Sequence, residues 1–145
     1  QLDSLLQNIG LTLEDVYIAN VLKYRPPNNR NPTTEEIIRH TPYLVRQIET
    51  IKPKVICTLG NFSTKFVLSG FQVAGMKTVP GITQLHGNFR DVETENYKVK
   101  VVPLYHPAAM LYNPKLKNTL ADDFKKLGEF LGTKKKEKTG LENWM

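Results

Sequence analysis

A histidine between an apolar run and a proline is the side chain in this sequence best placed to do chemistry. Residues 99–105 form the run, and His106 and Pro107 follow directly. Because a residue before a proline is biased toward extended backbone angles, we expect His106 to project from a strand end. Apolar side chains follow at Met110 and Leu111. A fixed donor beside an apolar wedge suits an enzyme that pushes a base out of a duplex and then attacks it, although a lone histidine here is more often a packed or capping residue.

A second polar side chain, Asn20, interrupts the apolar run of residues 16–22. If it is buried, its amide needs partners for four hydrogen-bonding positions, and a satisfied structural asparagine is the simpler interpretation of this residue alone. A proline-rich loop follows directly and carries three cationic side chains, at Lys23, Arg25 and Arg30. Such a loop suits phosphate binding, and an ordinary surface connection is the alternative.

Strand-like and helix-like patterns alternate along the chain, which predicts an α/β fold. Three apolar runs rich in β-branched or aromatic residues are the expected strands, at residues 16–22, 55–59 and 99–105. Helices are expected over residues 34–52, after Gly60 with Phe62 and Phe66 on the inner face, and from a cap at Asn118 to Gly132. Short alternating segments over residues 81–97 predict an antiparallel excursion. Ligands of open α/β sheets bind at the carboxyl ends of the strands, where Asn20, Gly60 and His106 are expected to meet.

The predicted architecture has three layers, α/β/α, around a mostly parallel four-stranded sheet. The chain opens on an amphipathic helix over residues 1–10 with no strand before it. We therefore expect the first strand of the sheet to be missing from this chain. The domain spans residues 1–132, and a basic tail covers residues 133–145.

Composition limits the classes of protein that this chain can represent. Its 145 residues are 40% hydrophobic and carry a net charge of +6, which fits one globular core and favours polyanionic partners. The sequence shows neither a long apolar span nor a signal peptide, so we expect a soluble, cytoplasmic protein without a membrane partner. The single cysteine, Cys57, excludes an internal disulfide, and its apolar neighbours predict a small buried strand residue.

Several separate motifs resemble one enzyme family. The run VYIANVLKYRPPNNRNP, residues 16–32, resembles the central motif of the family 4 uracil-DNA glycosylases. The segments TPYL, IKPKVICTLG and YHPAA, which begin at Thr41, Ile51 and Tyr105, match the same family in order and spacing. The resemblance implies a monomeric DNA repair enzyme that flips uracil out of DNA and hydrolyses its N-glycosidic bond, leaving an abasic site. A noncatalytic α/β module that binds nucleic acid or a partner protein is the alternative.

The resemblance also implies roles for individual residues. Asn20 would recognise uracil, because its amide offers the donor and acceptor that uracil requires and cytosine reverses. His106 would be the catalytic residue, donating to uracil O2 as negative charge develops on the departing base. The expected contacts to uracil-containing DNA are Lys23, Arg25, Arg30, Pro107, Ala108, Met110 and Leu111, with Tyr112 in the same loop. The alternative for Met110 and Leu111 is that they are core residues of the following turn.

Two features depart from the family. Its members usually hold an iron–sulfur cluster with four cysteines, and two of those positions are Tyr24 and His40 here. We therefore predict neither a cluster nor another metal or cofactor in this chain. The family's glycine-rich motif with its acidic residue, and the aromatic that stacks on uracil, lie upstream of the helix that opens this sequence. We expect the sequence to be a fragment of a longer protein.

Overall fold

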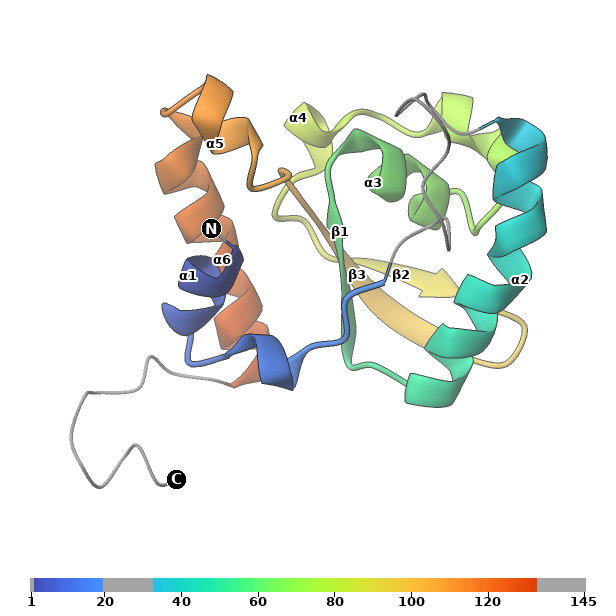
Figure 1. Cartoon of the computed structure of the whole chain (residues 1–145), viewed down its shortest axis with the longest axis horizontal. Coiled ribbons are helices and arrows are strands. Elements are labelled where there is room, and N and C mark those ends of the chain that lie inside the picture. Colours follow the sequence, from blue (N-terminus) through green and yellow to red (C-terminus); the bar gives the residue numbers. More distant parts are fainter. Residues whose placement is uncertain (1, 20–32, 133–145) are drawn as a thin grey trace.

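The structure is a computed structural model that describes residues 2–19 and 33–132 (Figure 1). The predictions for Asn20, for Tyr24 and for the cationic side chains at 23, 25 and 30 therefore lie outside the described residues. The expected tail at 133–145 lies outside them as well. None of the described helices is both long enough and apolar enough to cross a membrane.

A small mixed sheet forms the centre of the described chain. Its strands are β1 (Val55–Leu59), β2 (Arg90–Glu93) and β3 (Lys98–Leu104), in the spatial order β1-β3-β2. The β1–β3 pair is parallel and the β2–β3 pair is antiparallel, which confirms two predicted strands and the predicted antiparallel excursion. The predicted strand at residues 16–22 does not form over its described part, 16–19, and the three strands of the described sheet come from residues 55–59, 90–93 and 98–104.

Helices connect and cover these strands. The described α-helices are α1 (Leu2–Gln7), α2 (Thr34–Ile51), α3 (Asn61–Leu68), α4 (Ile82–Leu85), α5 (Ala109–Tyr112) and α6 (Leu116–Leu131). The described 3₁₀ turns are η1 (Leu13–Asp15) and η3 (Val73–Thr78). The ends of α2 agree with the predicted 34–52 within one residue, because a capping box begins this helix and Lys52, in a left-handed conformation, ends it.

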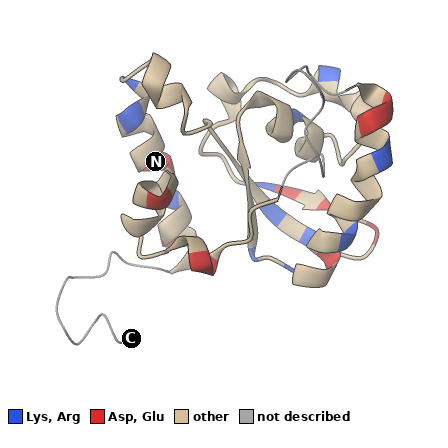
Figure 2. Ribbon diagram, in the orientation of Figure 1, with Lys and Arg blue, Asp and Glu red and all other residues tan. Residues whose placement is uncertain are grey.

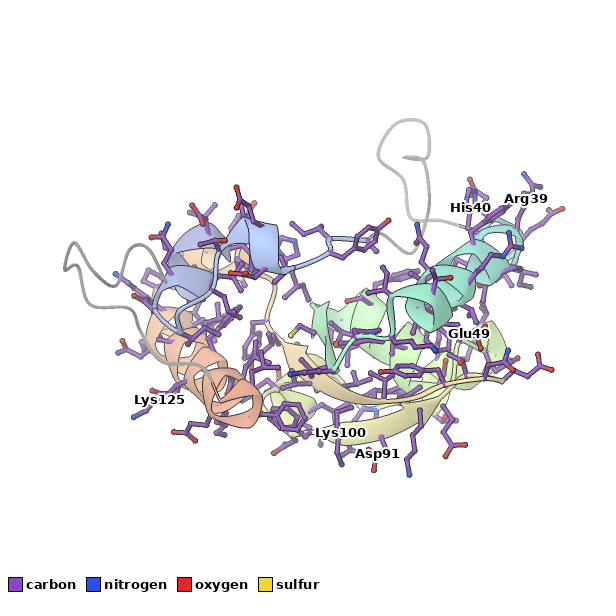
Figure 3. The ribbon with its side chains drawn as sticks, turned by 90° about the horizontal axis from the view of Figure 1, so that it is seen from below. Arg39, His40, Glu49, Asp91, Lys100 and Lys125 are labelled. Carbon is purple, nitrogen blue, oxygen red and sulfur yellow. The ribbon has the colours of Figure 1, made fainter. Side chains whose placement is uncertain are left out.

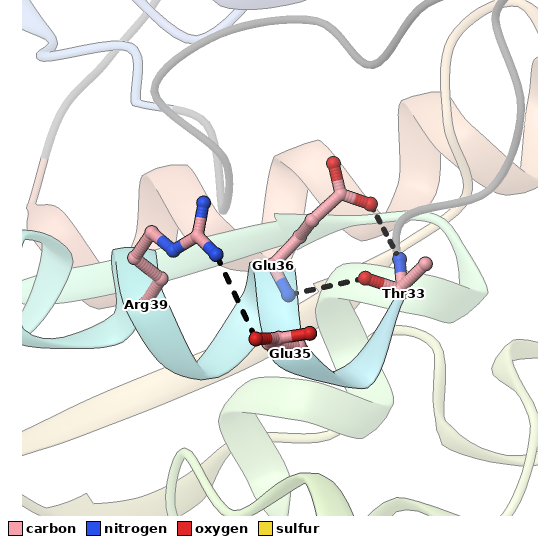
Figure 4. Close-up of polar contacts among 4 residues, drawn as sticks. All are labelled: Thr33, Glu35, Glu36 and Arg39. Atoms are coloured by element: carbon pink, nitrogen blue, oxygen red, sulfur yellow. Dashed lines mark hydrogen bonds and ion pairs between the residues drawn. The ribbon is translucent and has the colours of Figure 1, made fainter.

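The beginning of α2 shows how the sequence specifies this helix (Figure 4). The Thr33 hydroxyl accepts a hydrogen bond from the Glu36 amide at 3.2 Å, and the Glu36 carboxylate accepts one from the Thr33 amide at 2.9 Å. These two bonds pair backbone donors that no helical carbonyl can reach. The neighbouring Glu35–Arg39 ion pair, 3.8 Å long and exposed, adds little to stability.

Alternation along β3 creates the two cores of the domain. Val99 and Val101 belong to the core beneath α2 and α3, whereas Val102 and Leu104 belong to the core beneath α1 and α6. Because successive strand residues point to opposite faces, β3 is buried on both sides. The helices thus lie on both sides of the sheet, as Figure 1 shows, and the predicted three-layer α/β/α fold is confirmed.

Three local predictions were wrong. Asn118 lies inside α6 rather than capping it, because the Asn113-Pro114 turn starts the helix earlier. Phe62 is 39% exposed, and Phe66 alone of that pair enters the core. Cys57 is exposed on β1, an edge strand of the described sheet, although the surrounding protein desolvates its thiol and raises its pKa to about 12.

The β2–β3 hairpin is tied to α2 by one carboxylate. Glu49 accepts hydrogen bonds from the Thr94 hydroxyl and from the Asn96 amide, each at 2.8 Å. These donors, the Thr94 hydroxyl first, hold the pKa of Glu49 below its ordinary 4.5. Figure 3 shows Glu49 on α2, and it also shows Asp91 and Lys100, which form a cross-strand ion pair of 2.9 Å on the hairpin. The hydrogen bond from Lys100 lowers the pKa of Asp91 in the same way.

The lowered pKa of Glu49 predicts a pH-dependent effect of Glu49→Gln. A carboxylate whose folded pKa is depressed stabilises the protein above its unfolded pKa, and this contribution disappears as pH falls through the folded pKa. We expect Glu49→Gln to lower the free energy of unfolding at neutral pH and to have a progressively smaller effect as pH falls below 4.5. Urea unfolding at neutral pH and at a series of pH values below 4.5, with the exposed neighbour Glu95→Gln as control, measures this. A loss that stays constant across the series would contradict it.

Candidate active site at the carboxyl edge of the sheet

Two of the residues expected at the carboxyl edge of the sheet do meet there. Leu59 pairs with Leu104 in the parallel register, and the next amide, that of Gly60, donates to the Leu104 carbonyl at 2.8 Å. Gly60 has φ +92° and ψ −179°, a backbone conformation that is essentially restricted to glycine. A Cβ placed on Gly60 would lie 3.5 Å from the Cβ of His106. The prediction for this pair is confirmed, and Asn20 is not among the described residues.

The hydrogen bonds of the His106 ring indicate which of its two nitrogens carries the proton. Its Nδ1 accepts a hydrogen bond from the Ala108 amide at 3.1 Å, and its carbonyl accepts one from the Ala109 amide at 2.8 Å. Since Nδ1 acts as an acceptor, the proton of the neutral imidazole lies on Nε2. His106 is exposed, so this Nε2–H group is a donor at the surface of the sheet edge.

The segment after His106 separates core residues from exposed ones. Pro107 is buried, Ala108 is half-buried, and Met110 packs against the core beneath α1 and α6. Leu111 and Tyr112, at the end of α5, are 68% and 89% exposed. Of the two alternatives for the apolar pair, the core position therefore applies to Met110 and the exposed one to Leu111.

Cationic side chains adjoin this exposed apolar tip. Lys115 caps α6 and Lys117 lies in its first turn, and both are exposed. Figure 2 shows basic stretches of the ribbon at the end of α6 that follows α5. Since phosphate contacts in DNA complexes come largely from lysine and arginine, this end of the molecule has the charge that a DNA backbone requires.

Beside Tyr105, the residue that precedes His106, lies a polar pair that the sequence patterns do not indicate. His86 Nδ1 is 2.7 Å from Asp123 Oδ2, and the His86 ring lies against Tyr105 with 5.0 Å between centroids. The sequence pattern over residues 81–97 predicts only an antiparallel excursion and assigns no role to His86. The sequence does carry a signal for Asp123, because this acidic residue lies on the apolar face of α6 between Leu120, Phe124 and Leu127, where a charged side chain needs a partner.

The fold and this edge together define a class of protein. Residues 1–128 match the family described as the Uracil DNA glycosylase superfamily, and the chain belongs to it. The resemblance of its motifs to this family is thereby confirmed.

Particular relatives are type-4 uracil-DNA glycosylases. The enzyme of Archaeoglobus fulgidus is 48% identical over 133 residues, which cover 92% of this chain and 65% of that protein. The enzyme of Saccharolobus solfataricus is 46% identical over 87% of this chain and 56% of its own length. The enzyme of Thermotoga maritima is 39% identical over 90% of this chain and 64% of its own length. The chain thus spans between 56% and 65% of the length of these relatives.

Proposed function

We propose that this chain carries the uracil-excision site of a DNA repair glycosylase. The observation that carries the proposal is the hydrogen bond from the Ala108 amide to His106 Nδ1, which leaves Nε2–H as a fixed donor at the strand edge. The names of the relatives, type-4 uracil-DNA glycosylases, agree with this chemistry. The reaction breaks the bond between uracil N1 and the sugar, and water supplies the new oxygen on the sugar carbon.

His106 stabilises the departing base. As the glycosidic bond breaks, its electron pair moves onto uracil, and negative charge develops at O2. A neutral imidazole that donates from Nε2 meets this charge without having to reorient first. An oxyanion-hole donor of this kind lowers the barrier by about 3 to 4 kcal/mol.

Asn20 selects the base in this proposal. Its amide pairs with the carbonyl O4 and the N3–H of uracil, and cytosine presents the opposite order of donor and acceptor. Discrimination requires that the amide be clamped, because a flipped amide would accept cytosine.

The duplex is held by the segments around this site. Leu111, with Tyr112, occupies the gap that the flipped nucleotide leaves, and exposure of both side chains supports this role. Met110 supports the loop from the core, and Pro107 and Ala108 shape the turn that approaches the DNA. Lys23, Arg25 and Arg30 neutralise backbone phosphates.

An excision assay tests the proposal directly. The chain is incubated with uracil-containing single-stranded and duplex DNA, beside Asn20→Ala and His106→Ala. We expect abasic sites with the parent and a strong loss in both variants. Tight DNA binding without excision by the parent would instead support the noncatalytic binding module.

The donor set of this chain does not fit the iron–sulfur cluster that is usual in type-4 enzymes. The only cysteine of the sequence, Cys57, lies in β1, and His40 is buried in α2 with its ring 6.5 Å from that of Tyr43. Within residues 2–19 and 33–132, no three histidine, cysteine or acidic side chains are grouped so as to hold a metal ion. Since such clusters require cysteine thiolates, we propose that this chain binds none.

Iron analysis tests the proposal that this chain binds no iron–sulfur cluster. Purified chain is expected to contain far less than stoichiometric iron and acid-labile sulfide after anaerobic preparation. A type-4 relative prepared in parallel controls for cluster loss. Stoichiometric iron and sulfide in this chain would overturn the prediction.

We propose that the protein acts as a monomer in the cytoplasm, with uracil-containing DNA as its partner.

A further inference from the structure

The pair formed by His86 and Asp123 lies where it can control the position of His106. Asp123 is 2% exposed, and its Oδ2 is bonded to His86 Nδ1 at 2.7 Å. Because a carboxylate oxygen accepts, His86 Nδ1 carries a proton and donates it to Asp123. In His106 the same ring nitrogen, Nδ1, is instead an acceptor. A carboxyl group this deeply buried is costly unless it is paired, so the bond constrains both partners.

Through this pair, three separate elements are fixed to one another. Asp123 comes from α6, and His86 comes from the turn that follows α4. The next amide in that turn, Gly87, donates to the Pro103 carbonyl of β3 at 2.8 Å. The His86 ring also contacts the Tyr105 ring, with 36° between the planes. The end of β3 is therefore held by a backbone bond and by a ring contact on the same side.

We infer that His86 and Asp123 are positioning residues for excision, acting on the catalytic His106 through Tyr105. This inference rests on the proposed function. Tyr105 is joined to His106 by one peptide bond, so a change in the Tyr105 ring position moves the backbone that carries the imidazole. The Ala108 amide holds the His106 ring from the following turn, and the His86 ring contacts Tyr105, the residue before His106, from the strand side. Loss of the pair leaves His106 anchored on one side.

Variants of the pair separate positioning from folding. His86→Ala removes the ring and the bond, and Asp123→Ala removes the acceptor. Asp123→Asn keeps an oxygen that accepts from His86. Tyr105→Leu removes the ring contact and leaves the buried carboxyl paired, which preserves a test if the alanine variants do not fold. Asp122→Ala, on the exposed neighbour in α6, is the matched control.

Two measurements follow His106 itself. The sequence contains three histidines, so imidazole ¹⁵N spectra can be assigned by single substitutions, and they report the tautomer of His106 without any activity. Single-turnover excision with enzyme in excess gives a rate constant that does not depend on the fraction of folded enzyme. A misplaced catalytic group can lower such a rate by up to about 100-fold.

We expect His86→Ala, Asp123→Ala and Tyr105→Leu to alter the His106 nitrogen signals and to lower the single-turnover rate by about 10- to 100-fold. DNA affinity should stay unchanged in these variants, and Asp123→Asn and Asp122→Ala should behave like the parent. Parental His106 signals and rates in folded His86→Ala and Tyr105→Leu would overturn the inference. If the parent excises no uracil, the proposed function fails, and the nitrogen spectra still decide whether the pair positions His106.

Discussion

Replacing Gly87 by alanine is expected to lower the free energy of unfolding by about 3 kcal/mol or more. Gly87 is buried with φ +76°, and a left-handed conformation costs a residue with a Cβ about 1 to 2 kcal/mol. The added Cβ would also overlap Asp123 Oδ1 and lie 3.0 Å from its Cγ. Because Asp123 is buried, its carboxyl can yield only by weakening the bond to His86.

Gly70 is the matched control for this prediction. Its φ of +75° is nearly that of Gly87, and a Cβ there would meet nothing within 4 Å. Gly70→Ala therefore costs the backbone strain alone, about 1 to 2 kcal/mol. Urea unfolding of both variants beside the parent gives the difference, which isolates the contact with Asp123. Equal losses of unfolding free energy in Gly87→Ala and Gly70→Ala would contradict the prediction, because they would mean that the Asp123 carboxyl group moves aside at no energetic cost.

The parts of the fold that sequence could predict depend on local patterns. Residues 99–105 were recognisable as a buried strand because all of their side chains except Lys100 are apolar or aromatic. The strand β3 contacts both cores, as this pattern predicts. The helix α2 was recognisable from its apolar spacing and from Glu35 and Glu36 at its start. The edge shared by Gly60 and His106 followed from the general rule on carboxyl ends of parallel strands.

The parts that sequence could not predict depend on contacts between distant residues. The His86–Asp123 bond joins positions 37 residues apart, and no local pattern specifies that partner. The exposure of Cys57 depends on which strand lies beside β1, which the composition of β1 cannot reveal. Met110 and Leu111 have similar side chains, and only the turn geometry of α5 sends one to the core and the other to solvent.

The largest expected effect on activity comes from His106→Ala, which should lower the single-turnover excision rate by about 100- to 1,000-fold, the range for loss of one oxyanion-hole donor. The donor acts on charge that develops in the transition state, so the variant should bind uracil-containing DNA as tightly as the parent. His106→Gln keeps an N–H donor on a flexible side chain and should lose less activity than His106→Ala. Rate constants and Kd values on the same duplex measure both expectations.

A control variant makes this prediction specific to the imidazole donor. Glu129→Gln changes an exposed residue in the last turn of α6, at the opposite end of that helix from Lys115 and Lys117, and should keep the parental rate. A parental rate in His106→Ala would mean that leaving-group stabilisation comes from another residue.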